Sequence, residues 1–159
     1  IEKAIFACGC FWGVQHQMER AKRVIRSTVG YTGGKEQHPT YQEVKAHTTG
    51  HAEAVLVEYD AEQTTYKELC KLFFEIHDPA QTDGQGPDIG PQYRSEIFYL
   101  NEAQKAEAEA IIQLLREKGY EVNTRLTPAS EFWPAEDYHQ HYYDKTGGEP
   151  YCHIRVKKF

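Results

Sequence analysis

Residues 3–13 read KAIFACGCFWG and join an apolar segment to a glycine-flanked turn and the beginning of a helix. The short apolar run 3–7 predicts a buried strand. Beyond the turn, apolar residues recur at the spacing of one helix face, at Phe11, Val14, Met18 and Ala21. The chain therefore begins with a strand that passes directly into a helix, and Cys10 lies at their junction.

In the rest of the chain, apolar residues alternate between the spacing of a strand and the spacing of a helix. Further strands are predicted at 23–31, 51–59, 96–100 and 123–126, with Ile25, Ser27, Val29 and Tyr31 on one side of the first of them. Thr65 and Glu68 have capping-box spacing and precede a helix whose apolar face carries Leu69, Leu72, Phe73 and Ile76. Asn101 and Gln104 begin another helix, ended by Gly119, with an expected apolar stripe of Ala103, Ala106, Ala110, Ile111 and Leu114. A last helix is expected from 135 to about 143, and the alternation predicts a mixed sheet that carries helices.

Two connections, 32–50 and 78–95, are unusually long and rich in Gly and Pro. Compact domains keep connections of this length mainly when they form binding loops. Because Tyr41, Asp88 and Tyr93 would be unusual in a purely connecting surface loop, we interpret both segments as functional.

The composition excludes several classes of protein. A net charge of −6, from 18 Lys and Arg against 24 Asp and Glu, disfavours a nucleic acid or an anionic membrane as partner. No apolar run approaches the roughly 20 residues of a membrane span, and no signal-peptide pattern stands near Ile1. We expect one domain over residues 1–159, monomeric and cytoplasmic.

Cysteine and histidine spacing predicts no metal site. Cys8, Cys10, Cys70 and Cys152 include no CxxC pair, and the histidines lack HExxH-type spacing. The thiols are therefore buried or reactive. We expect Cys8 and Cys70, which lie in apolar segments, to be core residues.

Cys10 is the thiol best placed for chemistry. A helix start presents free N–H groups and partial positive charge, which favour a thiolate over a thiol. Gly9 and Gly13 allow a sharp turn and the close approach of another molecule, while Phe11 and Trp12 add aromatic surface beside the sulfur. A buried cysteine at a tight turn would produce the same pattern, so spacing alone leaves both interpretations open.

Glu53 is the candidate proton donor. It shares one side of its predicted strand with Val55, Val57 and Tyr59, where a carboxyl group loses hydration and its pKa should rise. The alternative is a strand-end glutamate that faces solvent or pairs with a cation. His51, two residues earlier, either supports Glu53 or is itself a solvated strand end.

Eight short blocks stand out in one order along the chain, from near residue 4 to near residue 153. They are Gly9-Cys-Phe-Trp-Gly13, Gly30-Tyr-Thr-Gly-Gly34, Pro39-Thr-Tyr41, Thr49-Gly-His-Ala-Glu53, His77-Asp-Pro79, Gln92-Tyr-Arg-Ser95, Ala135-Glu-Asp-Tyr-His-Gln140 and Tyr151-Cys152. Together these blocks resemble the A-type peptide-methionine sulfoxide reductases. Pro87 departs from the pattern, because relatives often have Asn there.

The resemblance implies an α+β fold. It is a two-layer sandwich of a mixed β-sheet and flanking helices, a ferredoxin-like plait with long loops and an irregular C-terminal tail. The resemblance also implies a single catalytic domain over residues 1–159 that reduces the S epimer of methionine sulfoxide, free or in proteins, to methionine.

Roles for individual residues follow from the matched blocks. Cys10 is the nucleophile, and a sulfenic acid on it would condense with Cys152, the resolving thiol. The substrate side is formed by Tyr41, Glu53 and Tyr93 around the sulfoxide oxygen, Phe11 and Trp12 around the methyl group, and Asp88 along the approach. Thioredoxin or another dithiol would reopen the disulfide as external reductant, with no metal or bound cofactor.

Two other functions are compatible with the residues alone. A cysteine hydrolase or acyltransferase would use Cys10 activated by His51 or His153. A non-catalytic peptide-binding module would use an aromatic surface that includes Trp133, and Cys10 would merely pack.

Overall fold

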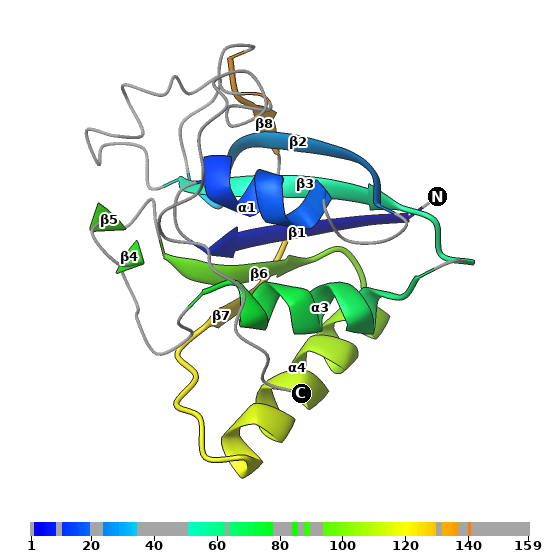
Figure 1. The fold of residues 1–159 in the computed structure, drawn as a ribbon, viewed down its shortest axis with the longest axis vertical. Coiled ribbons are helices and arrows are strands. Elements are labelled where there is room, and N and C mark those ends of the chain that lie inside the picture. The colour runs from blue at the N-terminus through cyan, green and yellow to red at the C-terminus, as the bar shows by residue number, and fades with distance from the viewer. Residues whose placement is uncertain are drawn as a thin grey trace.

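The structure is a computed structural model, and it describes residues 2–8, 11–19, 24–34, 51–62, 64–77, 84–85, 88–89, 94–129, 132–136 and 140. Figure 1 shows the arrangement of its helices and strands. In chain order these are β1 (Glu2–Cys8), α1 (Phe11–Glu19), β2 (Val24–Thr32), β3 (Ala52–Tyr59), α3 (Tyr66–Glu75), β4 (Gly84–Gln85), β5 (Asp88–Ile89), β6 (Ser95–Tyr99), α4 (Glu102–Glu117), β7 (Arg125–Pro128) and β8 (Trp133–Pro134).

A six-stranded sheet in the order β7-β6-β1-β3-β2-β8 forms the centre of the molecule. β1 pairs antiparallel with β3 and β6, β2 pairs antiparallel with β3, and β7 runs parallel to β6. The unit β1-α1-β2-β3-α3-β6, with β1 and β3 between the outer strands, is the ferredoxin-like plait. The α+β fold with a mixed sheet is therefore confirmed.

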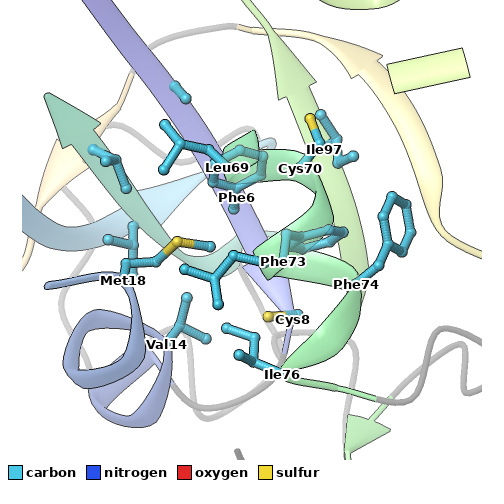
Figure 2. Close-up of a cluster of buried hydrophobic side chains, with 14 of the residues drawn as sticks. Phe6, Cys8, Val14, Met18, Leu69, Cys70, Phe73, Phe74, Ile76 and Ile97 are labelled. Atoms are coloured by element: carbon cyan, nitrogen blue, oxygen red, sulfur yellow. The ribbon is translucent and has the colours of Figure 1, made fainter. Parts of the chain in front are cut away.

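The helices cover one face of the sheet (Figure 1). Residues of α1, α3 and α4 join residues of β1, β2 and β3 in one buried cluster. Figure 2 shows part of this cluster, with Cys8 extending from the end of β1 beside Val14 of α1 and Ile76 at the end of α3. A smaller cluster on the opposite face includes Phe98, with Ala129 and Phe132 packed against it. This second cluster fixes the path of the chain from β7 towards β8.

Both predicted helix caps are present. The Thr65 hydroxyl accepts a hydrogen bond from the Glu68 N–H at 3.2 Å, and Asn101 Oδ1 accepts one from the Gln104 N–H at 2.8 Å. Such caps satisfy N–H groups that have no partner within the helix and stabilise it by about 1 kcal/mol each.

None of the described helices has the length and apolar character that a membrane crossing requires.

Two predicted burial patterns were wrong. Ile25 is 54% exposed because the pairing of β2 with β3 shifts between Val24 and Arg26, so that Ile25 is an extra residue in a β-bulge. The stripe predicted on α4 is also displaced, and Leu114 is 36% exposed. The buried residues of α4 are instead Gln104, Ala108, Ile111, Ile112 and Leu115.

Gln104 explains the orientation of α4. Its amide donates to the Lys3 carbonyl at 2.8 Å and accepts from the Leu100 N–H at 2.9 Å. These bonds make a polar residue the first buried residue of α4. The predicted helix from 135 to about 143 lies mostly outside the described residues.

The outer edge of β2 is covered by the short strand β8. Gly30 pairs with Pro134, and a Cβ added at Gly30 would stand 2.4 Å from the Trp133 carbonyl oxygen and 2.6 Å from the Phe132 ring. Only glycine allows this approach. Gly30 thus allows the segment that contains Phe132 and β8 to pack closely against β2.

Candidate active site

The strand ends that carry the predicted site gather at one end of the sheet, on the left in Figure 1. In the antiparallel pair of β1 and β3, Phe6 lies opposite Val55, so the end of β1 at Cys8 and the start of β3 meet. Cys8 in turn lies opposite Ser95, the first residue of β6. Because α1 begins directly after β1, the helix start belongs to the same end.

Glu53 lies near the start of β3 and is 1% exposed. It pairs with Tyr31 of β2, and strand alternation places it on the side of Val55 and Val57, which belong to the cluster beneath the helices. The prediction that Glu53 faces the apolar side is confirmed, and the solvent-facing alternative was wrong. Burial of a carboxyl group in such surroundings disfavours its charged form.

Tyr31 carries a second buried polar group beside Glu53. Its ring is fully buried, and its hydroxyl donates to Glu136 Oε1 at 3.0 Å. Two positions along β2, the Gln140 amide accepts from the Val29 N–H and donates to the Val29 carbonyl, both at 2.9 Å. The amide side chain therefore continues the ladder of β8, and two residues of the block 135–140 fasten that segment to β2.

His51 is 3% exposed and does not lie at a solvated strand end. Its Nδ1 accepts a hydrogen bond of 3.0 Å from the N–H of Gly34. Since a backbone N–H can only donate, Nδ1 carries no proton in this arrangement. The bond joins the two ends of the segment 35–50, which contains Tyr41.

His77 closes the second long connection in the same manner. It is 5% exposed, and its ring lies tilted against the Phe73 ring with the centroids 4.4 Å apart. Nδ1 lies 2.6 Å from the Phe73 carbonyl oxygen, which can only accept, so Nδ1 is the protonated nitrogen. Nε2 then accepts from the Ser95 hydroxyl at 2.8 Å, and Ser95 Oγ accepts from the Thr124 hydroxyl at 2.7 Å.

Arg94 lies between the hydrogen bonds made by His51 and His77. Its Nε donates to Glu96 Oε1 at 2.6 Å, both side chains are buried, and Thr127 donates to the other carboxylate oxygen of Glu96. A Cβ added at Gly33 would stand 3.0 Å from Arg94 Nη2, so the guanidinium packs directly on this glycine. Gly33 also has φ +86, which favours glycine at this position.

The structure describes only some of the predicted site residues. Glu53 and Trp12 are described, with Trp12 half-buried against the helix-side cluster in the first turn of α1. Phe11 begins α1, and Asp88 pairs with Gln85 in the two-residue strands β4 and β5. The remaining predicted residues, Cys10, Tyr41, Tyr93 and Cys152, lie outside the described residues.

Cys8 and Cys70 are core residues, as predicted. Burial raises the pKa of the Cys8 thiol well above its ordinary value. Burial also raises the pKa of Cys70 to about 12, although the interaction with the Tyr66 hydroxyl acts in the opposite direction. Neither thiol has the environment of a reactive cysteine.

A pocket at the opposite end of the sheet contains none of the predicted site residues. Its volume is about 390 Å³, and Glu2, Tyr59, Tyr66 and Glu107 contribute to its lining. The Tyr59 hydroxyl donates to Glu2 Oε2 at 3.1 Å. Burial raises the pKa of Tyr59, so this hydroxyl remains protonated across the physiological range.

Sequence reasoning assigned no role to Tyr31, Arg94, Ser95 or Gln140. All four lie inside the blocks that carry the family resemblance, which was the only signal for them. Their partners could not be identified from the sequence, because Gln140 is 111 positions from Val29 and Ser95 is 18 from His77.

Comparison with known proteins decides the family. Residues 2–159 match the family described as peptide methionine sulfoxide reductase. The chain belongs to this family. The peptide methionine sulfoxide reductase MsrA of Acinetobacter baumannii (strain AYE) is 46% identical over 156 residues, which cover 98% of this chain and 90% of the relative.

Solved structures agree with this family assignment. Mxr1 from Saccharomyces cerevisiae in its reduced form superposes with a TM-score of 0.89 at 34% identity, covering 97% of this chain and 91% of Mxr1. Mxr1 in complex with Trx2 gives a TM-score of 0.64 at 25% identity and covers 99% and 90% of the two chains. Membership in the reductase family favours sulfoxide reduction over the hydrolase and the binding module.

The burial of two thiols in this reductase predicts selective alkylation. At about pH 8, a thiol with a pKa of about 12 is ionised in about one molecule in 10⁴, and Cys70 is also inaccessible. We expect iodoacetamide to leave Cys8 and Cys70 unmodified in the native protein and to label both in urea, as mapped by mass spectrometry. Labelling of native Cys8 as fast as Cys10 would contradict this assignment.

Proposed function

We propose that this reductase uses Cys10 as nucleophile and Glu53 as proton donor to reduce the S epimer of methionine sulfoxide, free or within proteins. The observation that carries the proposal is the buried carboxyl of Glu53 on the apolar side of β3, at the end of the sheet where α1 begins. A carboxyl in such a position favours its neutral form, and a neutral carboxyl can donate a proton.

The start of α1 supports a thiolate at position 10. Cys10 directly precedes Phe11, the first residue of the helix, and the first turn of α1 contains no acidic residue. The N–H groups of that turn therefore face no carboxylate of their own helix and favour a negative charge beside them. This environment is opposite to that of Cys8, whose burial disfavours the thiolate.

The reaction needs both groups. The Cys10 thiolate attacks the electrophilic sulfur of the sulfoxide, while Glu53 gives its proton to the oxygen, because oxide itself is a very poor leaving group. The substrate S–O bond breaks, the released hydroxide adds to the Cys10 sulfur, and the transient bond between Cys10 and the substrate sulfur breaks with its electron pair on the substrate, which leaves a sulfenic acid on Cys10 and releases methionine as the thioether. The substrate sulfur gains two electrons and Cys10 loses two, so the step is balanced without a metal or a bound cofactor.

Substrate recognition is assigned to the residues that the family resemblance indicates. Hydroxyl groups of Tyr41 and Tyr93 stabilise the charge that develops on the oxygen, and this polar contact distinguishes a sulfoxide from a thioether. Phe11 and Trp12 enclose the S-methyl group, consistent with the position of Trp12 in the first turn of α1. Asp88, on β5, lines the approach.

Recycling is assigned to Cys152 and an external dithiol. The Cys152 thiol attacks the sulfenic acid, which forms a disulfide and releases water, and a dithiol then reduces this disulfide by exchange. The complex of Mxr1 with Trx2 supports thioredoxin as that reductant.

We further propose that residues 1–159 act as one catalytic domain and as a monomer. We place this monomer in the cytoplasm, because thiols such as Cys70 persist in the reduced state in that compartment.

The role of Glu53 predicts a specific loss of rate. In Glu53→Gln the side chain keeps its size but loses its transferable proton, so single-turnover reduction of a racemic methyl sulfoxide should slow about 10²–10⁴-fold. Glu58→Gln, on the same strand, is the matched control and should reduce the sulfoxide at the wild-type rate. Stopped-flow thiol loss measures both variants. An unchanged rate in Glu53→Gln would remove this residue from acid catalysis, whereas Cys10→Ser should abolish turnover in any case.

The role of Cys152 predicts a separation of the two half-reactions. Cys152→Ser should release one equivalent of methionine at the wild-type rate and should then fail to turn over with thioredoxin. Chromatography of the product after one and many equivalents of substrate distinguishes these steps. Thioredoxin-supported cycling at the normal rate would transfer the resolving role to another thiol or to direct reduction of Cys10.

A further inference from the structure

Two buried histidines occupy equivalent positions in the two long connections. His51 directly follows the segment 35–50 and binds Gly34, the residue directly before it. His77 directly precedes the segment 78–93 and binds Ser95, two residues beyond its end. Each imidazole therefore joins the two ends of one loop, at 3.0 Å and 2.8 Å respectively.

Arg94 connects the two histidine hydrogen bonds. Gly33, beside the hydrogen bond of His51, packs on the Arg94 guanidinium, and Arg94 immediately precedes Ser95, to which His77 binds. The buried ion pair with Glu96 fixes the guanidinium. Because a buried charge that loses its partner is very unfavourable, the Arg94 side chain has a strong preference for this one position.

We propose that His51 and His77 are positioning residues for sulfoxide reduction, which act by holding the bases of the loops that carry Tyr41 on one side and Asp88 and Tyr93 on the other. The inference rests on the proposed function, which assigns these three residues to the substrate. Their loops begin and end at the same end of the sheet as Glu53. The imidazoles touch neither substrate nor sulfur in this proposal, and they act through the loops.

The chemistry of each contact favours histidine. At position 51, the hydrogen bond needs a buried acceptor, since the Gly34 N–H is a donor. At position 77, the residue must donate to the Phe73 carbonyl at the end of α3 and also accept from the Ser95 hydroxyl. A neutral imidazole has one donor and one acceptor nitrogen and satisfies both at once.

The test compares variants that remove one contact and keep the rest. His51→Leu removes the acceptor for Gly34, and His51→Asn restores an oxygen near the position of Nδ1. His77→Asn keeps a donor for the Phe73 carbonyl and loses the contact with Ser95. Gln104→Leu is the control, because it removes a buried side chain with two hydrogen bonds at the opposite end of the sheet.

Two rates separate positioning from general destabilisation. In His51→Leu and His77→Asn, single-turnover reduction at low sulfoxide should slow about 10–100-fold, because small displacements of substrate-contacting groups have effects of this order. Reduction of the preformed disulfide by thioredoxin should change less than about twofold, and His51→Asn should recover most of the first rate. Gln104→Leu should leave both rates unchanged. The proposal would be overturned if both rates fell in parallel, or if His51→Leu and His77→Asn reduced the sulfoxide at the wild-type rate.

Limited proteolysis gives a readout that does not depend on activity. The His51→Leu variant should be cleaved within 35–50, and His77→Asn within 78–93, sooner than the wild type and Gln104→Leu, as mapped by mass spectrometry. If the wild type reduces no sulfoxide, the proposed function fails, while these cleavage patterns still decide whether the histidines hold the loops. Unchanged cleavage in both variants would contradict the loop-holding role.

Discussion

A buried carboxyl group on the apolar face of β3 is the constraint on which the site depends. Glu53 is buried and shares its side of the strand with Val55 and Val57, which belong to the cluster beneath the helices. Removing an ionised carboxylate from water is costly, so such a group tends to retain its proton. In the proposed reaction this burial keeps Glu53 protonated at neutral pH, where an exposed glutamate would be ionised. The ferredoxin-like plait places Glu53 at the end of the sheet where α1 begins, and the start of that helix would favour the thiolate proposed for Cys10.

The proposed mechanism requires opposite environments for Glu53 and Cys10. A buried carboxyl group favours its neutral form, as the proposal needs for Glu53, whereas a helix start favours an anion, as it needs for Cys10. Cys8 illustrates the difference, because it is only two residues from Cys10 and its burial raises its pKa. Two positions in the sequence thus separate a buried core thiol from the proposed nucleophile.

Hydrogen bonds of His51 and His77 lie where the two long connections meet the sheet and helices. The sheet and helices have apolar cores, but the segments that leave them at 34 and 77 begin with histidine contacts and the buried Arg94–Glu96 pair. Polar contacts of this kind are directional, so they fix the orientation of a loop where apolar packing alone would not. Gln140 fastens the C-terminal segment to Val29 in the same manner. The described part of the candidate site therefore contains several buried polar contacts beside Glu53 and the start of α1.

Local features of the sequence were sufficient for most of the fold. Thr65 and Asn101 cap their helices as predicted, because a cap is determined by residues three positions apart. The face of Glu53 followed from strand alternation in the same manner. The stripe of α4 could not be predicted, since it depends on a bond from Gln104 to Lys3, 101 positions away. The bulge at Ile25 depends on the pairing of two strands, and the partners of His77 and Gln140 depend on the tertiary fold. Family resemblance indicated the important blocks but gave no contacts between them.

The protonation state of Glu53 in the resting enzyme tests the central claim most directly. Infrared difference spectra of the wild type and Glu53→Gln at neutral pH, with isotope-labelled glutamate, isolate the signal of this one group. The account predicts a carbonyl band of a protonated carboxylic acid in the wild type that is absent from the variant. A difference spectrum that contains only carboxylate bands would show that Glu53 is ionised, and it could not then be the proton donor.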